Sequence, residues 1–153
     1  MGMFDAIEIA ASGLSAQRLR MDVTAENLAN AQTTRGPDGG PYRRKSVVLQ
    51  EAGDGSFARR LAGAVGGSGR VGGAAEPPAG VEAVAIVPDN TPLRRVYDPG
   101  HPDADADGYV QMPNVNPVTE MVDLIDASRA YEANLTAMQT AKAAFAKTLE
   151  LLR

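Results

Sequence analysis

The carboxyl-terminal stretch of the chain, residues 116–152, constrains the fold more than any other segment. It contains no glycine, and its single proline, Pro117, stands where the first turn of a helix tolerates one. Apolar side chains recur in steps that alternate three and four, the spacing of a helix that lies along another helix. Asn116 is suited to cap the first free N–H groups. The pattern predicts one long helix over residues 116–152.

Two rows of side chains follow this spacing on different faces of the predicted helix, because neighbouring residues are about 100° apart around the axis. The first row is mostly large: Met121, Leu124, Ser128, Tyr131, Leu135, Met138, Lys142, Phe145, Leu149 and Leu152. The second row is mostly small: Ala127, Ala130, Asn134, Ala137, Ala141, Ala144 and Thr148. A helix with two unlike faces can pack against two neighbours, which favours a chain built for assembly.

The amino-terminal segment carries the same alternation and predicts a second helix from Phe4 to about Asn30. Its row is Phe4, Ile7, Ala11, Leu14, Arg18, Met21, Ala25 and Leu28. Gly13 lies inside this helix and costs about 1 kcal/mol against alanine, so packing must supply the stability. The predicted fold is mainly α, with long terminal helices in residues 1–35 and 116–153 packed as a coiled-coil hairpin.

The segment between the helices, residues 36–115, predicts a small and irregular β insert. Turn-forming glycines and prolines fill residues 36–41, and β-branched residues predict strands at 42–50, 81–87 and 93–97. Residues 52–80 are rich in glycine and alanine and have linker composition, so we expect a flexible loop there. Residues 101–114 are expected to be irregular.

Composition argues against several classes of function. The chain has no cysteine, which excludes disulfides and thiolate metal sites, and its net charge of −4 argues against a nucleic-acid partner. The basic cluster Arg43, Arg44 and Lys45 is too short to reverse this and is interpreted as a solvated strand edge. No segment reaches the ~20 apolar residues of a membrane span. Asp5 and Glu8 stand where a secretory signal would be basic and then apolar, so we expect no cleaved signal peptide.

The sequence holds two weak signals for site chemistry. His101, the only histidine, lies among turn-forming residues, which favours an exposed turn over a catalytic base. Asp103, Asp105 and Asp107 match the first half of a calcium loop, but Asn114 stands where that loop needs a bidentate carboxylate. We interpret this segment as an acidic solvated loop and expect no catalytic residue, cofactor or metal.

Motifs at both ends of the chain resemble those of bacterial flagellar rod and hook proteins. They are residues 11–17 (ASGLSAQ), 23–31 (VTAENLANA) and 120–134 (EMVDLIDASRAYEAN). Internal motifs at residues 36–43, 96–102 and 108–115 are similar to those of the proximal rod proteins within this family. The resemblance covers nearly the whole chain except residues 52–80.

The resemblance implies a structural subunit of the proximal rod, a tubular shaft that transmits torque and surrounds the export channel. It implies export through the flagellar type III apparatus, location in the periplasmic rod, and contacts with copies of itself and with neighbouring rod proteins. The alternative is a soluble helical-hairpin adaptor or binding module of another flagellar assembly step. The assembly interface is expected at Ile7, Leu14, Met21, Leu28, Met121, Leu124, Tyr131, Leu135, Met138, Phe145, Leu149, Leu152, Ala130, Ala137, Ala141 and Ala144.

Overall fold

The computed structural model describes residues 3–36, 39–52 and 80–151. The predicted interface residue Leu152 and almost all of the predicted loop at 52–80 therefore lie outside the described residues. The elements in chain order are α1 (Met3–Ala29), β1 (Lys45–Ala52), β2 (Gly80–Pro88), β3 (Arg94–Tyr97), β4 (Tyr109–Met112) and α3 (Pro117–Leu151).

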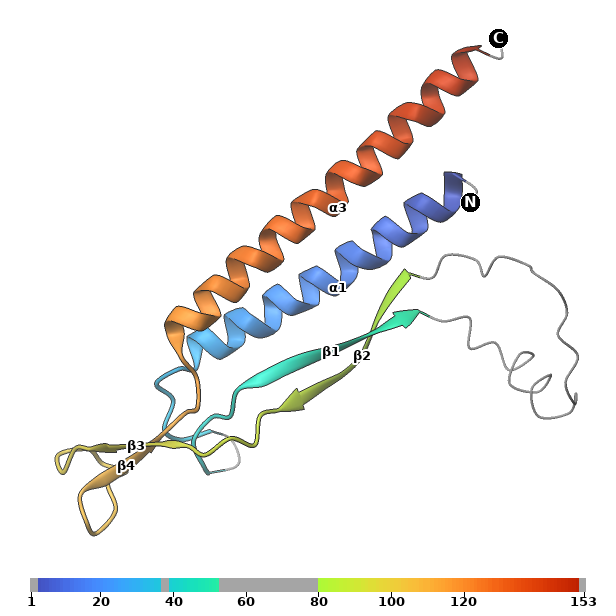
Figure 1. Ribbon diagram of the computed structural model, residues 1–153. Coiled ribbons are helices and arrows are strands. Elements are labelled where there is room, and N and C mark those ends of the chain that lie inside the picture. The colour runs from blue at the N-terminus through green and yellow to red at the C-terminus, as the bar shows by residue number, and fades with distance from the viewer. Residues whose placement is uncertain (1–2, 37–38, 53–79, 152–153) are drawn as a thin grey trace, which may run out of the picture.

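The elements form three layers, with α1 in the middle (Figure 1). Helix α3 lies along one side of α1, and the β1–β2 hairpin lies along another side. The β3–β4 hairpin lies beyond the end where α1 stops and α3 begins. Both termini lie at the opposite end, where α3 runs past the start of α1. The predicted fold class, two long terminal helices packed together around a small β insert, is confirmed.

Helix α3 begins where the sequence predicted. The Asn116 side-chain oxygen accepts the Val118 N–H at 3.1 Å, and the Asn116 carbonyl accepts the Glu120 N–H at 3.0 Å. Pro117 is the first helical residue and has no N–H to satisfy. The cap therefore binds one of the free donors of the first turn, which fixes the point where the irregular chain becomes helix.

The side of α3 that is least exposed alternates between the two predicted rows. Along the helix it consists of Glu120, Leu124, Ala127, Tyr131, Asn134, Met138, Ala141 and Phe145. We call this set the α3 seam. A large residue from the first row is thus followed by a small one from the second, which lets side chains interdigitate with a neighbouring helix. The remaining large residues Met121, Leu135 and Leu149 lie outside the seam and are exposed.

The helices run antiparallel and approach closely at Gly13. Asn27 contacts Glu120, and Gly13 lies against Asn134, so both contacts join positions fourteen residues apart on each helix. A Cβ on Gly13 would lie 2.9 Å from the Asn134 side-chain nitrogen. The glycine that weakens an isolated helix gives the Asn134 side chain room here, because a Cβ at position 13 would require that side chain to shift.

The β1–β2 hairpin is antiparallel and docks on α1. Its register runs from Lys45 opposite Pro88 to Ala52 opposite Gly80, with an irregularity between Val48 and Leu49. The Ser12 hydroxyl of α1 donates to the Ile9 carbonyl at 2.8 Å and accepts the Val81 N–H at 3.0 Å. The strands were predicted at 42–50 and 81–87, and pairing carries them on to Ala52 and Gly80.

The expectation that residues 101–114 are irregular was wrong for Tyr109–Met112, which form β4. This strand pairs antiparallel with β3, from Arg94 opposite Met112 to Tyr97 opposite Tyr109. Gly108 precedes it with φ of +79°, a conformation that glycine adopts at no steric cost. Four residues are too few for a periodic signal, and the strand exists because β3 supplies a partner.

The buried apolar residues in the described part of the chain are small. They are Ala10, Ala16, Val23, Ala31, Val110, Val115 and Ala127. Because each buries little area, the hydrophobic stabilisation of this core is modest, at ~25 cal/mol per Å² of apolar surface. Small side chains do allow close helix packing, so the single subunit has close contacts but little apolar bulk.

We predict that Gly13→Ala lowers the free energy of unfolding by about 1 kcal/mol, because overpacking against Asn134 outweighs the gain in helix propensity. In an Asn134→Ala background the same substitution should instead raise it by about 1 kcal/mol. Urea unfolding of the four proteins of this cycle measures both effects. A stabilising Gly13→Ala in the otherwise unchanged chain would contradict the close approach.

Candidate functional site

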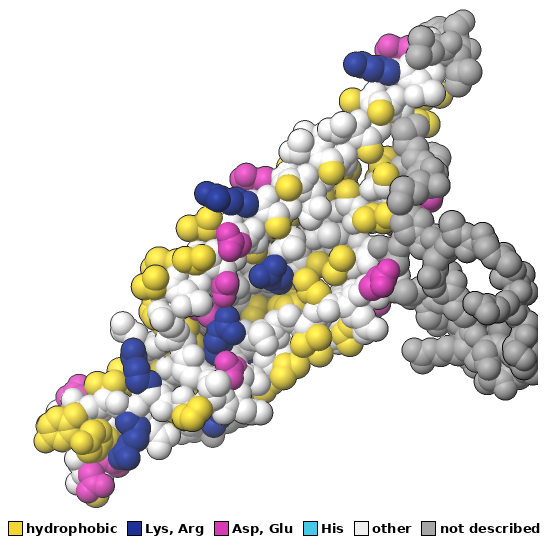
Figure 2. All heavy atoms as spheres, in the orientation of Figure 1, with side chains coloured by type: hydrophobic (Ala, Val, Ile, Leu, Met, Phe, Trp, Pro, Cys, Tyr) yellow, Lys and Arg dark blue, Asp and Glu magenta, His cyan; other side chains and the backbone are white. Residues whose placement is uncertain are grey.

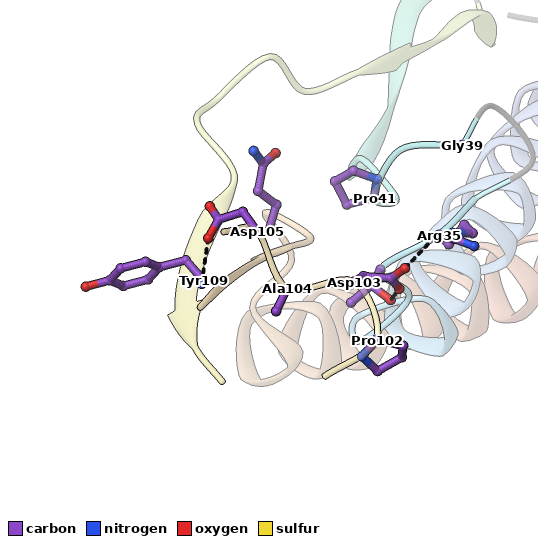
Figure 3. Close-up of a pocket in the computed structure, with 10 residues that line it drawn as sticks. Arg35, Gly39, Pro41, Pro102, Asp103, Ala104, Asp105 and Tyr109 are labelled. Carbon is purple, nitrogen blue, oxygen red and sulfur yellow. Dashed lines mark hydrogen bonds and ion pairs between the residues drawn. The ribbon is translucent and has the colours of Figure 1, made fainter. Parts of the chain in front are cut away.

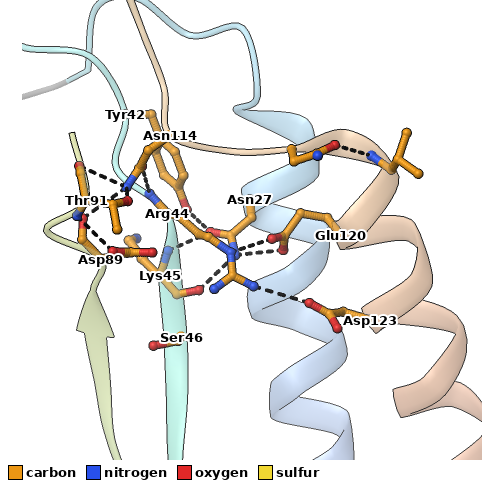
Figure 4. Close-up of polar contacts among 12 residues, drawn as sticks. Asn27, Tyr42, Arg44, Lys45, Ser46, Asp89, Thr91, Asn114, Glu120 and Asp123 are labelled. Atoms are coloured by element: carbon orange, nitrogen blue, oxygen red, sulfur yellow. Dashed lines mark hydrogen bonds and ion pairs between the residues drawn. The ribbon is translucent and has the colours of Figure 1, made fainter. Parts of the chain in front are cut away.

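Asn27, near the end of α1, is 1% exposed and uses every hydrogen-bonding position of its side chain (Figure 4). Its oxygen accepts the Lys45 N–H and the Tyr42 hydroxyl, both at 2.8 Å. Its nitrogen donates to the Lys45 carbonyl at 2.8 Å and to the Glu120 carboxylate at 3.0 Å. One amide therefore binds the start of β1 as a neighbouring strand would and also holds the first turn of α3.

Glu120 is also 1% exposed, and its charge is paired with Arg44. Arg44 donates from Nε to Glu120 Oε1 at 2.6 Å and from Nη2 to Asp123 Oδ2 at 3.2 Å. The hydrogen bond to Glu120 raises the pKa of Arg44. A buried carboxylate is costly unless it is paired and hydrogen-bonded, and here a cation and an amide both bind it.

Asn114 extends these contacts to the loops before α3. Its oxygen accepts the Arg44 N–H at 2.9 Å, and its nitrogen donates to Thr91 Oγ1 at 2.8 Å and to the Asp89 carbonyl at 3.2 Å. The Thr91 N–H donates to the Asp89 side chain at 2.9 Å, and this bond lowers the pKa of Asp89. The chain after β2 and the chain before α3 are thus bound to the same arginine.

Tyr42 completes the cluster, and burial raises its pKa to about 12, with the Glu26 and Glu120 carboxylates adding to the effect. Beside it, Lys45 Nζ lies 2.5 Å from Glu26 Oε1. We call Asn27, Tyr42, Arg44, Asn114 and Glu120 the polar junction. No buried side-chain nitrogen or oxygen in the described residues lacks a hydrogen-bond partner, so the junction is fully satisfied.

The interpretation of Arg43, Arg44 and Lys45 as a solvated strand edge was wrong for Arg44. Arg43 is exposed, and the Lys45 side chain is 38% exposed, but the Arg44 side chain is only 28% exposed and serves the buried carboxylate. The signal that could have revealed this is Glu120, which stands four residues before Leu124 on an otherwise apolar or neutral seam. An acid at such a position requires a cation from elsewhere in the chain.

The acidic loop does not gather its carboxylates. Asp103 accepts from Arg35 at 2.7 Å and from the Thr34 hydroxyl at 2.9 Å. Asp105 pairs with Arg95 at 3.1 Å and accepts two backbone N–H groups, and the one from Tyr109 contributes most to lowering the Asp105 pKa. Among the described residues, no three histidine, cysteine, aspartate or glutamate side chains are placed to hold a metal. Asp105 and Asp107 are exposed, as the predicted acidic solvated loop requires, and Asp103 and Asp105 each pair with an arginine.

A surface pocket of about 390 Å³ lies beside this loop (Figure 3). Its lining includes Arg35, Asp103, Asp105 and Tyr109. The Arg35 guanidinium and the Asp103 carboxylate bind each other, and Asp105 binds Arg95. His101 accepts the Asp103 N–H at 3.1 Å and so helps to shape the turn. The charged groups are engaged with one another, which is the arrangement of a structural loop.

The structure divides the predicted interface residues into two groups. Those that are half-buried within the subunit are Ile7, Leu14, Met21, Leu28, Leu124, Ala130, Tyr131, Met138, Ala141 and Phe145. Those that remain exposed are Met121, Leu135, Ala137, Ala144 and Leu149. The first group is partly covered within the subunit, and the second leaves more of its apolar surface open.

Sequence reasoning missed a cluster of apolar residues at the start of α3. Val118, Val122 and Ile125 are 69%, 53% and 52% exposed, and Met121 beside them is 51% exposed. Figure 2 shows hydrophobic side chains gathered over this part of the helix. We call these four residues the α3 patch. The sequence signal was the number of apolar residues in 118–125, because it is larger than a single packed helix face can bury.

Two packed helices, a small core and an exposed apolar surface are the arrangement of a structural subunit. Comparison with known proteins supports this class of protein. Residues 7–37 match the family described as flagella basal body rod protein, and residues 106–151 match the family described as flagellar basal body rod FlgEFG protein C-terminal. The matches cover α1 and α3, the two helices that the polar junction joins.

Relatives that match over nearly their whole length show which family of rod proteins the chain resembles. The chain is 46% identical to the flagellar basal-body rod protein FlgC of Bacillus subtilis, over 99% of each chain. It is 43% identical to that of Borreliella burgdorferi, over 100% of this chain and 99% of the relative, and 41% identical to that of Salmonella typhimurium, over 99% and 98%. The chain belongs to the FlgC family of flagellar basal-body rod proteins, which are structural and not enzymes. No helix in the described residues is apolar enough over its length to cross a membrane.

We predict that Asn27→Asp lowers the free energy of unfolding by about 3 kcal/mol, because it removes both donors and sets a second carboxylate against Glu120. Asn30→Asp is the matched control. The Asn30 nitrogen binds only the carbonyl one turn back, at 2.9 Å, so this change should cost less than about 1 kcal/mol. Urea unfolding at pH 7 measures both, and equal losses would contradict the role of Asn27.

We predict that the stability of the protein falls between pH 10 and 12 in a way that depends on Tyr42. The unfolded chain releases the tyrosine proton near pH 10, whereas the folded chain holds it until about pH 12. The stabilisation is therefore complete below pH 10 and is lost as the pH rises through the folded pKa. Tyr42→Phe should show a shallower decline in denaturation midpoint over this interval. Identical slopes for the two proteins would contradict the prediction.

Proposed function

We propose that the protein is a subunit of the proximal rod that joins neighbouring subunits through the exposed faces of its terminal helices and so builds a tubular shaft. The observation that carries this proposal is the α3 patch, where four large apolar side chains lie open on a helix already packed on α1. Contiguous exposed apolar surface marks an interaction site in a soluble domain. Membership of the rod family supports a rod subunit as the occupant.

The distribution of apolar groups supports an open assembly. Besides the α3 patch, the β1–β2 hairpin exposes Val48, Val84, Ile86 and Val87, by 45%, 57%, 49% and 42%. The two surfaces belong to the outer layers on different sides of α1 (Figure 1). An open helical filament requires heterologous contacts, in which unlike surfaces of successive subunits meet. A subunit with two unlike apolar surfaces meets that requirement.

The mechanical role follows from the same packing. We propose that torque passes between subunits through many small helix contacts and within each subunit through the helix pair. The polar junction supports this view, because it binds α1, β1 and α3 to one another and resists sliding between them. The export channel would then run inside the wall that these helices build.

The proposed location is the part of the rod that crosses the periplasm, and the proposed route there is the flagellar export apparatus. The proposed partners are further copies of this chain and neighbouring rod proteins. The small-residue core supports export, since a subunit with modest hydrophobic stabilisation is easily unfolded for passage through a narrow channel.

We predict that Ile125→Asp and Leu135→Asp abolish swimming, and that Ile125→Asp, at a side chain that is 52% exposed, changes the free energy of unfolding by less than about 1 kcal/mol. The reason is that a charge at the interface must be buried unpaired when subunits meet. The assay is complementation of a flagellated strain that lacks its own protein of this family, read as spreading in soft agar and as rods in electron micrographs.

Thr119→Asp is the matched control for these substitutions. Thr119 is exposed in the first turn of α3, where acidic residues are favourable, and Asp126 lies two turns further on the same flank. This variant should swim as the unmodified protein does. Normal rods and swimming with Ile125→Asp and Leu135→Asp would contradict the proposed interface.

A further inference from the structure

The α3 seam nearly repeats every seven residues. Its large positions are Leu124, Tyr131, Met138 and Phe145, and its small positions are Ala127, Asn134 and Ala141. A slide of α3 along α1 by one heptad would therefore place large residues where large ones were and small residues where small ones were. Such seams specify their register weakly unless a polar residue breaks the repeat.

The close contact at Gly13 does not break the repeat. Asn134 now lies over Gly13, and a slide of seven residues would bring Ala127 or Ala141 there instead. Alanine is smaller than asparagine, so the space beside Gly13 would accept either one. The apolar and small groups of the seam are thus compatible with three registers that differ by about 10 Å along the axis.

The polar junction is compatible with only one of these registers. Glu120 is the only acidic residue on the α3 seam, and Ala127 is the seam residue seven positions later. A slide that placed Ala127 beside Asn27 would leave the Asn27 donor and the Arg44 guanidinium without the carboxylate they bind at 3.0 Å and 2.6 Å. Buried polar groups without partners are costly, so the displaced registers are disfavoured.

The junction also connects the register to the rest of the fold. Asn27 binds Lys45 of β1 through two hydrogen bonds, and Asn114, just before α3, binds the Arg44 N–H. The β1–β2 hairpin carries one exposed apolar surface, and α3 carries the other. Their relative position is therefore decided where Asn27, Arg44 and Glu120 meet.

We infer that Asn27, Arg44 and Glu120 are positioning residues that select the register of α1 against α3 and so hold the exposed surfaces of the subunit at the separation that assembly requires. The consequence for assembly rests on the proposed function. The selection of register does not, and it is tested on the isolated full-length chain, so the two can fail separately.

The experiment uses disulfide cross-linking, because the chain has no cysteine of its own. Gly13→Cys with Asn134→Cys reports the observed register, since the Asn134 side chain lies where a Cβ on Gly13 would be. Gly13→Cys with Ala127→Cys or with Ala141→Cys reports a slide of one heptad in either direction, and both pairs also carry Asn134→Ala so that the side chain at position 13 has room in the observed register. Each pair is oxidised in dilute solution, and intramolecular bonds are counted by non-reducing gel and peptide mass mapping.

With the junction intact, the 13–134 bond should form and the two displaced bonds should be minor. With Asn27→Leu and Glu120→Leu, the ratio of native to displaced bonds should fall by about tenfold or more. Asn30→Leu, three residues along α1 and outside the junction, is the matched control and should leave the ratio unchanged. An unchanged ratio in the double variant, with helical circular dichroism retained, would overturn the proposal.

A second variant is used in case the double substitution unfolds the helices. Glu120→Gln keeps the shape of the side chain and removes the charge that Arg44 binds. Its native-to-displaced ratio should fall by about threefold. If this variant keeps its helical circular dichroism and its ratio equals that of the unmodified junction, the register is set by other contacts and the inference is wrong. A lower thermal stability alone would not move this ratio, so the readout separates positioning from general stabilisation.

Discussion

The burial of the Glu120 carboxylate is the constraint on which the rest of the fold depends. A charge that is 1% exposed persists only where a cation and hydrogen-bond donors meet it, and these come from elements far apart in sequence. Arg44 comes from the residue just before β1, and Asn27 comes from near the end of α1, 93 residues before Glu120. Three elements must therefore reach one point before any of these groups is satisfied. The layered arrangement of hairpin, α1 and α3 is the one that brings them there.

Around the polar junction, the subunit buries few large apolar residues. Alanine and valine fill the core in the described part of the chain, and Gly13 lets Asn134 approach the backbone of α1. Several larger residues, among them Ile125 and Leu149, stay at least half exposed. In the proposed assembly these residues would become buried when the subunit meets its neighbours. The division between inner and outer apolar groups is the one that the proposed function requires.

The charged loop before β4 is likewise ordered with little apolar burial. A run of alternating aspartates could serve a cation, yet Asp103 pairs with Arg35, and Asp105 pairs with Arg95 and accepts backbone N–H groups. Arg95 additionally lies over the Tyr109 ring, with its guanidinium carbon 4.7 Å from the ring centre. These contacts order a short hairpin that has almost no core of its own. The charged side chains of this loop therefore stabilise the conformation of the hairpin.

Features that depend on neighbouring residues could be predicted from the sequence. The heptad spacing in residues 4–30 and 116–152 predicted the two helices. The Asn116 cap predicted the start of α3, and the turn-forming run at 36–41 predicted the break between helix and insert. Each is local because a helix binds its own backbone and a cap binds the next turn. The motifs at both ends carried the family resemblance in the same local way.

Three features depend on contacts between distant parts of the chain: which residues of each row face inward, that β4 is a strand, and that Arg44 is partly buried. Nothing in the sequence indicates that Glu120 and Asn27 are in contact, because 93 positions separate them. A seam that repeats every seven residues leaves the register open, and the pairing of rows follows from contacts with α1 that no single helix contains. The polar groups could be placed only once the chain had brought their partners together, because the energy of a buried charge depends on what surrounds it.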